Sequence, residues 1–220
     1  MDSYAYGMWP LVLINAGIFI FFVFSFLKPK GQWEWRSMGA YTAFVVALFT
    51  EMYGFPLTIY VLASVLGSRY PATNPFSHVN GNLFAILAGG SEWVSGFFML
   101  LGGALMFVGL VVMGRGWKQI HGARKDELVT SGLYNRVRHP QYFGLFLITV
   151  GMLVQWPTII TAAMWPILMF MYYRLARREE KGLENRFGYS YVTYRQRVPM
   201  FLPRLSSAVP ANSDAHLRIH

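Results

Sequence analysis

The sequence contains no cysteine among its 220 residues. This absence excludes disulfide bonds, thiolate metal ligands and cysteine nucleophiles. Histidine is also scarce, with 5 residues in the whole chain. His78 and His121 stand alone rather than at the spacing typical of metal ligands. We therefore expect the protein to work without a metal ion.

Charged residues are also scarce in the sequence. They make up 13% of the chain, whereas a soluble domain carries about 25%. Hydrophobic residues account for 55%, and the mean hydropathy is +0.36. This composition indicates an all-α integral membrane protein that lies in the lipid bilayer. The length allows one domain, or one domain with a small appendage.

Three apolar stretches in the first part of the chain match a membrane span, which needs about 20 residues. They are Trp9–Leu27, Gly39–Leu66 and Val94–Met113. The first lacks the basic flank and the small-residue cleavage site of a signal peptide, so we expect it to be retained. The second is interrupted by Glu51 and by the Gly-Phe-Pro step at 54–56.

The last apolar stretch, 142–173, is too long for one simple span. The Trp-Pro step at 156–157 breaks it, because proline ends or kinks a helix near the preceding residue. We therefore predict a helical hairpin made of 142–155 and 157–173. The hairpin brings the predicted number of transmembrane helices to about five.

Basic residues are distributed unevenly between these stretches. Of the 19 Lys and Arg, three lie between the first and second stretch, one between the second and third, six before the hairpin and nine after it. The positive-inside rule then places 18 of the 19 in the cytoplasm. We predict a multi-pass protein, in a bacterial inner membrane, with its N-terminus outside and its C-terminus cytoplasmic. The loop 67–93 would lie outside, with a short helix near 82–88.

The net charge of +9 is explained by this topology and by attraction to anionic lipid. Nucleic-acid binding is therefore not expected.

The stretch RHPQYFG at 138–144 stands at the start of the hairpin. Pro140 suits the first position of a helix, since its missing N–H would be unpaired there anyway. The free N–H groups and the dipole of a helix start favour an anion, and Arg136, Arg138 and His139 add positive charge. The stretch predicts a pocket for a carboxylate or phosphate at the cytoplasmic face. The alternative is an ordinary helix start flanked by anchoring residues.

A second charged stretch, RLARREEK at 174–181, follows the hairpin. Antiparallel packing of the hairpin would bring 138–142 and 174–180 together at one edge. The adjacent carboxylates of Glu179 and Glu180 suit ribose hydroxyls or an ammonium group. A zwitterionic ligand, such as an amino-acid moiety, fits such a meeting of cations and anions. The alternative is a solvated helix end with local ion pairs.

Two blocks around the hairpin resemble the signature of the isoprenylcysteine carboxyl methyltransferase and phospholipid methyltransferase superfamily. The first block is LVTSGLYNRVRHPQYFG at 128–144, and the second is REEKGLENRFGYSYVTYRQRVPMFLP at 178–203. One departure is Gly-Leu-Tyr at 132–134, where the family often has Gly-Pro-Tyr. The resemblance covers roughly 94–204, which divides the chain into N-terminal helices with an outer loop (1–93), a membrane methyltransferase core (94–204) and a disordered tail (205–220).

The resemblance implies an integral membrane methyltransferase that uses S-adenosyl-L-methionine. In such enzymes the cofactor lies in a cytoplasmic pocket closed by the C-terminal segment, and a tunnel admits a lipophilic small-molecule acceptor from the bilayer. The acceptor could be a prenylcysteine-like carboxylate, a phospholipid amine or a small thiol. Tyr191 and Tyr194 match the closing segment. The residues that match the cofactor site are Leu128, Val129, Tyr134, Arg138, His139, Pro140, Tyr142, Gly144, Glu179 and Glu180.

Two residues outside these blocks are candidates for a catalytic role on the acceptor. Arg174 ends the last predicted span and would orient an anionic acceptor, or it is an arginine that snorkels to the interface. Glu51 lies within a predicted span, where a carboxylate is costly and points to function, or it is a neutral, hydrogen-bonded structural acid. Methyl transfer chiefly requires alignment and exclusion of water. An amine acceptor would also need a base, and the sequence does not identify one.

Two other functions are weighed against methyl transfer. Membrane sterol reductases have a related C-terminal fold and bind NADPH at the equivalent edge, although they are usually longer and have more spans. The third hypothesis is a non-catalytic scaffold or a transporter-like protein. A measurement of which cofactor binds would distinguish these three hypotheses.

Overall fold

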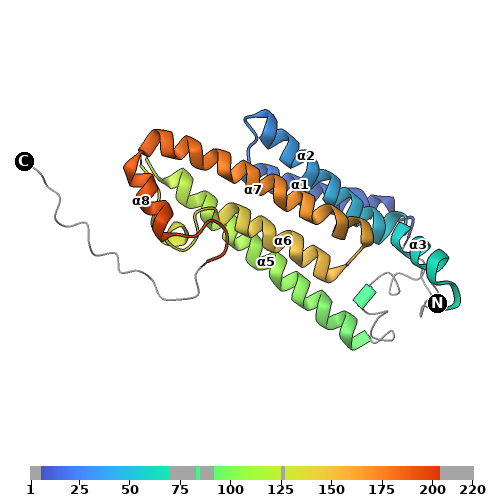
Figure 1. Cartoon of the computed structure of the whole chain (residues 1–220). Coiled ribbons are helices and arrows are strands. Elements are labelled where there is room, and N and C mark those ends of the chain that lie inside the picture. The colour runs from blue at the N-terminus through green and yellow to red at the C-terminus, as the bar shows by residue number, and fades with distance from the viewer. Residues whose placement is uncertain (1–5, 70–82, 85–91, 125–126, 204–220) are drawn as a thin grey trace, which may run out of the picture.

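The computed structural model describes residues 6–69, 83–84, 92–124 and 127–203 (Figure 1). All regular elements within these ranges are helices, which confirms the all-α class. The predicted helix near 82–88 lies almost wholly outside them, as do His78 and the tail 205–220. The main helices are α1 (Trp9–Phe26), α2 (Gln32–Phe49), a π-helix (Thr50–Gly54), α3 (Leu57–Leu66), α5 (Glu92–Gly122), α6 (Pro140–Gln155), α7 (Ile159–Phe187) and α8 (Tyr189–Arg197).

The chain forms a multi-pass membrane protein. Among the described residues, three helices are long and apolar enough to cross a bilayer, namely α1, α5 and α7. The pair of α2 and α3 makes a fourth crossing if it counts as one span bent by 68°. The helix α6 has 16 residues, or about 24 Å, which is shorter than the apolar layer of about 30 Å. Where about five helices were predicted, the described part of the chain thus has three or four full-length crossings and one shorter apolar helix.

The bend in the second crossing lies at the Gly-Phe-Pro step predicted to interrupt it. Pro56 has no N–H to continue the helix, and α3 begins directly after it. Glu51, in the π-helix, accepts hydrogen bonds from the Thr58 backbone N–H (3.0 Å) and hydroxyl (3.2 Å). The Thr58 hydroxyl oxygen in turn accepts from the Ile159 N–H (3.1 Å). The buried carboxylate therefore ties the start of α3 to the start of α7.

The helices α5 and α6 approach each other through paired glycines. A Cβ atom at Gly102 would lie 2.6 Å from the Gly151 carbonyl oxygen, and one at Gly109 would lie 2.6 Å from the Gly144 carbonyl oxygen. Gly102 and Gly109 are seven residues apart on α5, and Gly144 and Gly151 are seven residues apart on α6. The two glycines of each helix therefore lie on one face of it. Membrane helices use such small residues for close backbone contact. These glycines set how near α6 can come to α5.

The predicted hairpin is correct in its order and direction, since α6 and α7 follow one another and run antiparallel (Figure 1). Its two helices nevertheless pack mainly against other partners, α6 against α5 and α7 against α2. The paired glycines on α5 and α6 explain why α6 packs against α5. The core that α7 shares with α2 holds Tyr41, Phe44, Leu168 and Tyr172.

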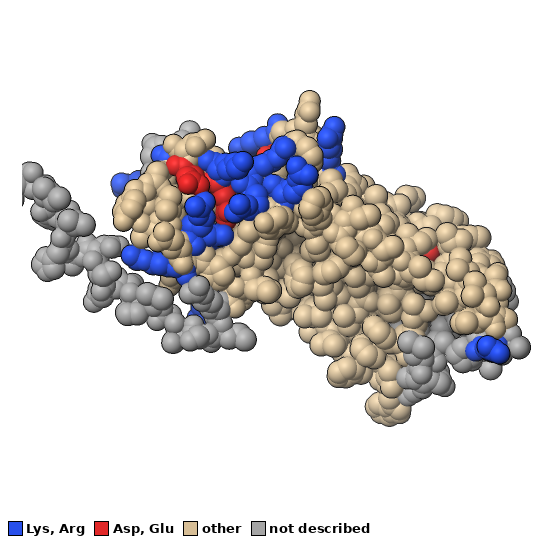
Figure 2. Space-filling model, in the orientation of Figure 1, with Lys and Arg blue, Asp and Glu red and all other residues tan. Residues whose placement is uncertain are grey.

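Charge is concentrated at one end of the molecule. Figure 2 shows Lys, Arg and acidic side chains gathered over that end, and a broad, largely uncharged surface that separates them from one small basic patch at the opposite end. The apolar part of α7, residues 159–173, contains no charged residue, and its charged part, 174–187, begins with Arg174. The charged residues of α7 therefore all follow its apolar part, at the charged end of the molecule.

Candidate functional site

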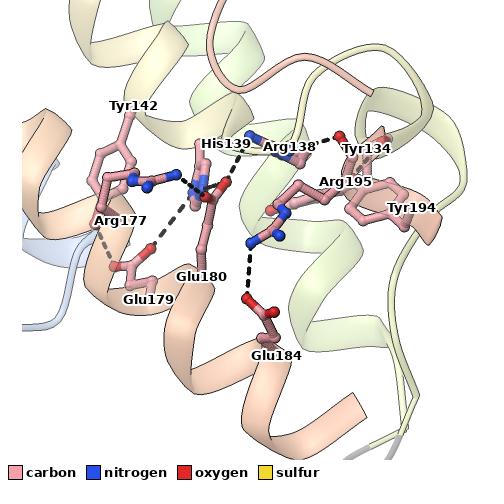
Figure 3. A network of polar contacts seen from close by, with 10 residues as sticks. All are labelled: Tyr134, Arg138, His139, Tyr142, Arg177, Glu179, Glu180, Glu184, Tyr194 and Arg195. Carbon is pink, nitrogen blue, oxygen red and sulfur yellow. Dashed lines mark hydrogen bonds and ion pairs between the residues drawn. The ribbon is translucent and has the colours of Figure 1, made fainter. Parts of the chain in front are cut away.

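The start of α6 meets the charged part of α7 in a network of polar contacts (Figure 3). Arg138 Nη2 lies 2.9 Å from Glu180 Oε1, and His139 Nε2 lies 3.3 Å from the same oxygen. The Tyr142 hydroxyl donates to Glu179 Oε1, and His139 Nδ1 lies 3.6 Å from Glu179 Oε2. The structure thus brings together these five predicted residues, which we call the polar network. The predicted meeting of 138–142 with 174–180 is confirmed.

The central ion pair of the network is largely shielded from solvent. The side chains of Arg138 and Glu180 are 10% and 2% exposed, and buried charges are tolerated only when they are paired. Burial alone would raise the pKa of Glu180. The hydrogen bond with His139 and the charge of Arg138 outweigh it and hold that pKa below its usual value. Glu180 is therefore ionised at neutral pH.

The C-terminal segment after α8 crosses the network through its backbone. The N–H groups of Arg138 and His139 donate to the carbonyl oxygens of Pro199 (2.9 Å) and Met200 (3.1 Å). Arg138 Nη1 donates to the Arg195 carbonyl oxygen (2.8 Å). Sequence reasoning missed these three acceptors, because a carbonyl acceptor leaves no side-chain signal. The second sequence block, with Tyr191 and Tyr194, pointed to a closing segment but not to these contacts.

Tyrosines fix α8 beside the network. The Tyr194 hydroxyl donates to the Tyr134 carbonyl oxygen (2.7 Å). Burial, with a smaller effect of the neighbouring Tyr191, raises the pKa of Tyr194, so its hydroxyl keeps the proton that it donates. Leu128 packs against a buried group formed by Tyr191, Tyr194 and Val198. Leu128 and Tyr134 therefore contact the closing segment, and Val129 is half-buried next to Leu128.

Two predicted cofactor residues face α5 instead of the polar network. Pro140 lies against Gly116, where an added Cβ would be 3.2 Å from the proline Cγ. Gly144 packs against Gly109 and Met113. Both residues set the position of the α6 start on α5, and that start carries His139. Their direct contact with a cofactor stays a prediction.

The two predicted catalytic residues lie outside the network. Arg174 is exposed and its guanidinium carbon lies 5.3 Å from the centre of the Trp33 ring and 5.7 Å from that of Phe170. Glu51 lies past the far end of α2, a helix of 18 residues that is about 27 Å long. The structure does not bring either residue to His139, and their action on an acceptor stays a prediction.

Replacement of Glu51 by leucine is expected to lower the free energy of unfolding by about 1–3 kcal/mol, because the Thr58 N–H and hydroxyl lose their buried acceptor. Glu51→Gln keeps one acceptor oxygen and should lose less. Denaturant unfolding in detergent measures both. Affinity for S-adenosylmethionine should stay unchanged in the two variants, and a weaker affinity in Glu51→Gln would contradict a structural role.

Two atoms of the polar network are left without a hydrogen-bond partner. They are Arg138 Nε and Glu180 Oε2, both buried and unmatched among the residues that the structure describes. The closest cation to Glu180 Oε2 is Arg177 Nη1, at 3.7 Å. One cationic donor and one anionic acceptor of the network thus lack a hydrogen-bond partner among the described residues. This arrangement fits a ligand that carries both a carboxylate and an ammonium or hydroxyl group, as S-adenosylmethionine does.

The sequence matches a known family and several of its relatives. Residues 94–185 match the family model described as the isoprenylcysteine carboxyl methyltransferase (ICMT) family. Protein-S-isoprenylcysteine O-methyltransferase B of Arabidopsis thaliana is 33% identical over 120 residues, which is 50% of this chain and 60% of the relative. The enzyme of the same type from Schizosaccharomyces pombe is 29% identical over 110 residues, 48% of this chain and 47% of the relative.

A relative with a different name matches equally well. The nickel-cobalt-cadmium resistance protein NccN of Alcaligenes xylosoxydans xylosoxydans is 32% identical over 130 residues, which is 56% of this chain and 60% of the relative. The chain thus spans no more than 60% of the length of these three relatives. No solved structure matches the chain significantly. Residues 94–185 of this chain are thus similar to the isoprenylcysteine carboxyl methyltransferase superfamily.

Proposed function

We propose that this protein transfers a methyl group from S-adenosylmethionine to a lipophilic acceptor at the cytoplasmic face of the membrane. The observation that carries the proposal is the buried polar network, in which Arg138 Nε and Glu180 Oε2 have no hydrogen-bond partner among the described residues. All five residues of the network lie inside the part of the chain that matches the family, residues 94–185. Its position at the charged end of the molecule agrees with a site at a membrane surface (Figure 2).

The residues of the network divide the proposed binding between opposite charges. Arg138 and His139 would hold the carboxylate of the methionine moiety, and Glu179 and Glu180 would bind its ammonium group or the ribose hydroxyls. Tyr142 would keep Glu179 in place through their hydrogen bond. When bound, S-adenosylmethionine supplies a methyl group that is already activated by a sulfonium sulfur. Orientation and exclusion of water are then the main tasks of the protein.

Exclusion of water would fall to the C-terminal segment. Its hydrogen bonds to Arg138 and His139 hold it across the network. The ring of Phe201 lies between His139 and Tyr173, with centroid distances of 5.9 and 6.3 Å. The Phe201 ring would thus help to exclude water from the reacting groups. Leu128, Val129 and Tyr134 would flank the adenine at the base of the same segment.

The proposed acceptor is a prenylcysteine-like carboxylate. The names of the relatives from Arabidopsis thaliana and Schizosaccharomyces pombe support this class. The chemistry also favours it, because an ionised carboxylate has no proton to lose before it attacks a methyl group. A phospholipid amine would need a base, and each carboxylate of the network already has a cation or hydroxyl partner. A small lipophilic thiol is the second acceptor that a methyl-transfer assay should include for comparison.

Calorimetric titration of the detergent-purified protein tests the proposal. S-adenosylmethionine and S-adenosylhomocysteine should bind saturably, and NADPH should not. His139→Ala should abolish adenosyl binding, whereas His121→Ala should retain it, because His121 lies at the end of α5 and contacts Trp117 instead of the network. Binding of NADPH in place of the adenosyl ligands would favour a reductase. Absence of both would leave the polar network as a structural ion-pair cluster.

A further inference from the structure

A second group of cations lies on the outer face of α7, apart from the central ion pair. Tyr173, Arg174, Arg177, Arg178 and Lys181 line a surface hollow of about 260 Å³. The four basic residues are spaced i, i+3, i+4 and i+7, so they form one stripe along the helix. We call this hollow the arginine pocket. It lies at the membrane-proximal end of the charged part of α7.

The start of α2 lies beside the arginine pocket, where its Trp33 contacts two of the lining arginines. The guanidinium carbon of Arg178 lies 4.0 Å from the centre of the Trp33 ring, and those of Arg36 and Arg174 lie 5.2 and 5.3 Å from it. Three guanidinium groups therefore surround the indole ring of Trp33. Cation–π contacts favour each of them, but like charges at such short range repel one another. A bound anion would remove that repulsion.

The pocket has few carboxylates to balance its charge. Within the described part of the chain, Arg177 alone among its basic residues reaches an acid, Glu180, at 3.7 Å. Arg36, Arg174, Arg178 and Lys181 form no ion pair with any described residue. Glu34, near the start of α2, uses its carboxylate to accept the backbone N–H groups of Lys30 and Gly31. The pocket is therefore strongly positive and open to a ligand from outside.

Apolar side chains continue the same face of α7 toward the membrane. Ile167 and Phe170 are 62% and 57% exposed, and the Arg174 guanidinium carbon lies 5.7 Å from the Phe170 ring centre. A ligand that fills this face has an anionic head at the arginine pocket and an apolar tail along Ile167 and Phe170. A phospholipid in the adjacent leaflet presents both parts at these depths.

We propose that the arginine pocket binds one anionic phospholipid through its phosphate head group, with the acyl chains on Ile167 and Phe170. The lipid would hold the charged part of α7 against the start of α2, through Arg178, Arg174 and Arg36. The same part of α7 carries Glu179 and Glu180, so the lipid would also steady the polar network. The proposal does not depend on methyl transfer, since it rests on cations outside the central ion pair.

Native mass spectrometry of the detergent-purified protein, mixed with equal amounts of palmitoyl-oleoyl phosphatidylglycerol and phosphatidylcholine, tests the proposal. The wild type should retain one phosphatidylglycerol in clear preference to phosphatidylcholine. The variant Arg178→Gln with Lys181→Gln should bind it at least about tenfold more weakly, because two charge-assisted contacts are lost. Arg36→Gln should weaken it in the same direction from the α2 side.

The matched control is Arg115→Gln with Lys118→Gln, which removes an exposed pair of cations at the same spacing from α5. It should leave the preference unchanged. Equal loss in this control, or full preference in the Arg178 and Lys181 variant, would overturn the proposal. Displacement of phosphatidylglycerol by N-acetyl-S-farnesylcysteine, with the same dependence on Arg178 and Lys181, would assign the pocket to an acceptor and would also overturn it. Helical content by circular dichroism confirms that each variant is folded.

Discussion

Replacement of Glu180 by glutamine is expected to weaken binding of S-adenosylmethionine at least tenfold and to lower the free energy of unfolding by about 3 kcal/mol. Glutamine keeps the shape of the side chain and removes its charge. Arg138 would then be a nearly buried cation without a counter-ion, since Glu180 is its only carboxylate partner among the described residues. The variant therefore separates charge from packing.

Glu184→Gln is the matched control for this change. It lies one turn further along α7 and forms its own ion pair with Arg195 at 2.8 Å, but both side chains are more than one-third exposed at 34% and 39%. Exposed pairs contribute about 0–1 kcal/mol. Isothermal titration calorimetry and denaturant unfolding measure affinity and stability in both variants. Similar losses in the two would contradict a special role for the Arg138–Glu180 pair.

The pH dependence of the Glu180 effect provides a check on its cause. The pKa of Glu180 is lowered in the folded protein, so its stabilising effect is complete above the pKa of an unfolded glutamate, about 4.3. The effect is lost as the pH falls through the lower folded-state pKa. The part of the stability difference between wild type and Glu180→Gln that is due to the Glu180 charge should therefore shrink as the pH falls below about 4.

Replacement of Gly102 by alanine is expected to lower the free energy of unfolding by about 1–3 kcal/mol. The new methyl group would meet the backbone carbonyl oxygen of Gly151 at 2.6 Å and Gln155 Cβ at 2.7 Å. Neither neighbour is the flexible end of a side chain, so the two helices must separate. Because α6 begins beside His139, this separation should also weaken binding of S-adenosylmethionine.

Gly103→Ala is the control for Gly102→Ala, because it changes the adjacent residue of the same helix. A Cβ atom at Gly103 would meet nothing within 4 Å. Alanine also favours the helix over glycine by up to about 1 kcal/mol. Unfolding by sodium dodecyl sulfate in mixed micelles should therefore show Gly103→Ala at or above wild-type stability. Equal destabilisation of both variants would mean that close packing of α5 and α6 does not limit stability.

The sequence predicted the parts of the fold that depend on local physics. Hydropathy located the apolar helices, and the proline steps at 54–56 and 156–157 located their breaks. The antiparallel packing expected of the hairpin predicted that 138–142 would meet 174–180, as Arg138 and His139 meet Glu179 and Glu180. The helices and their breaks are signals of a few neighbouring residues, and the meeting needed only the direction of two consecutive helices.

The parts that were missed depend on which helices pack together. The seven-residue spacing of Gly102 with Gly109, and of Gly144 with Gly151, is visible in the sequence and would have paired α5 with α6. The contact of Arg174 with Trp33 could not be foreseen, because it requires α7 to lie on α2. The extension of α7 to Phe187 was also missed as one continuous helix, because the predicted hairpin helix ended with its apolar residues.

The most direct test of the central claim is a methyl-transfer assay with S-adenosylmethionine that carries a tritiated methyl group. Purified protein in lipid nanodiscs would be incubated with N-acetyl-S-farnesylcysteine, and the organic extract counted after the free cofactor is removed. We predict that label enters the extract as a base-labile methyl ester, that it requires the acceptor, and that Glu180→Gln abolishes it whereas Glu184→Gln does not. Incorporation that is absent with this acceptor, with a phospholipid amine and with a lipophilic thiol, in protein that binds S-adenosylmethionine, would contradict the assignment as a methyltransferase of membrane lipophiles.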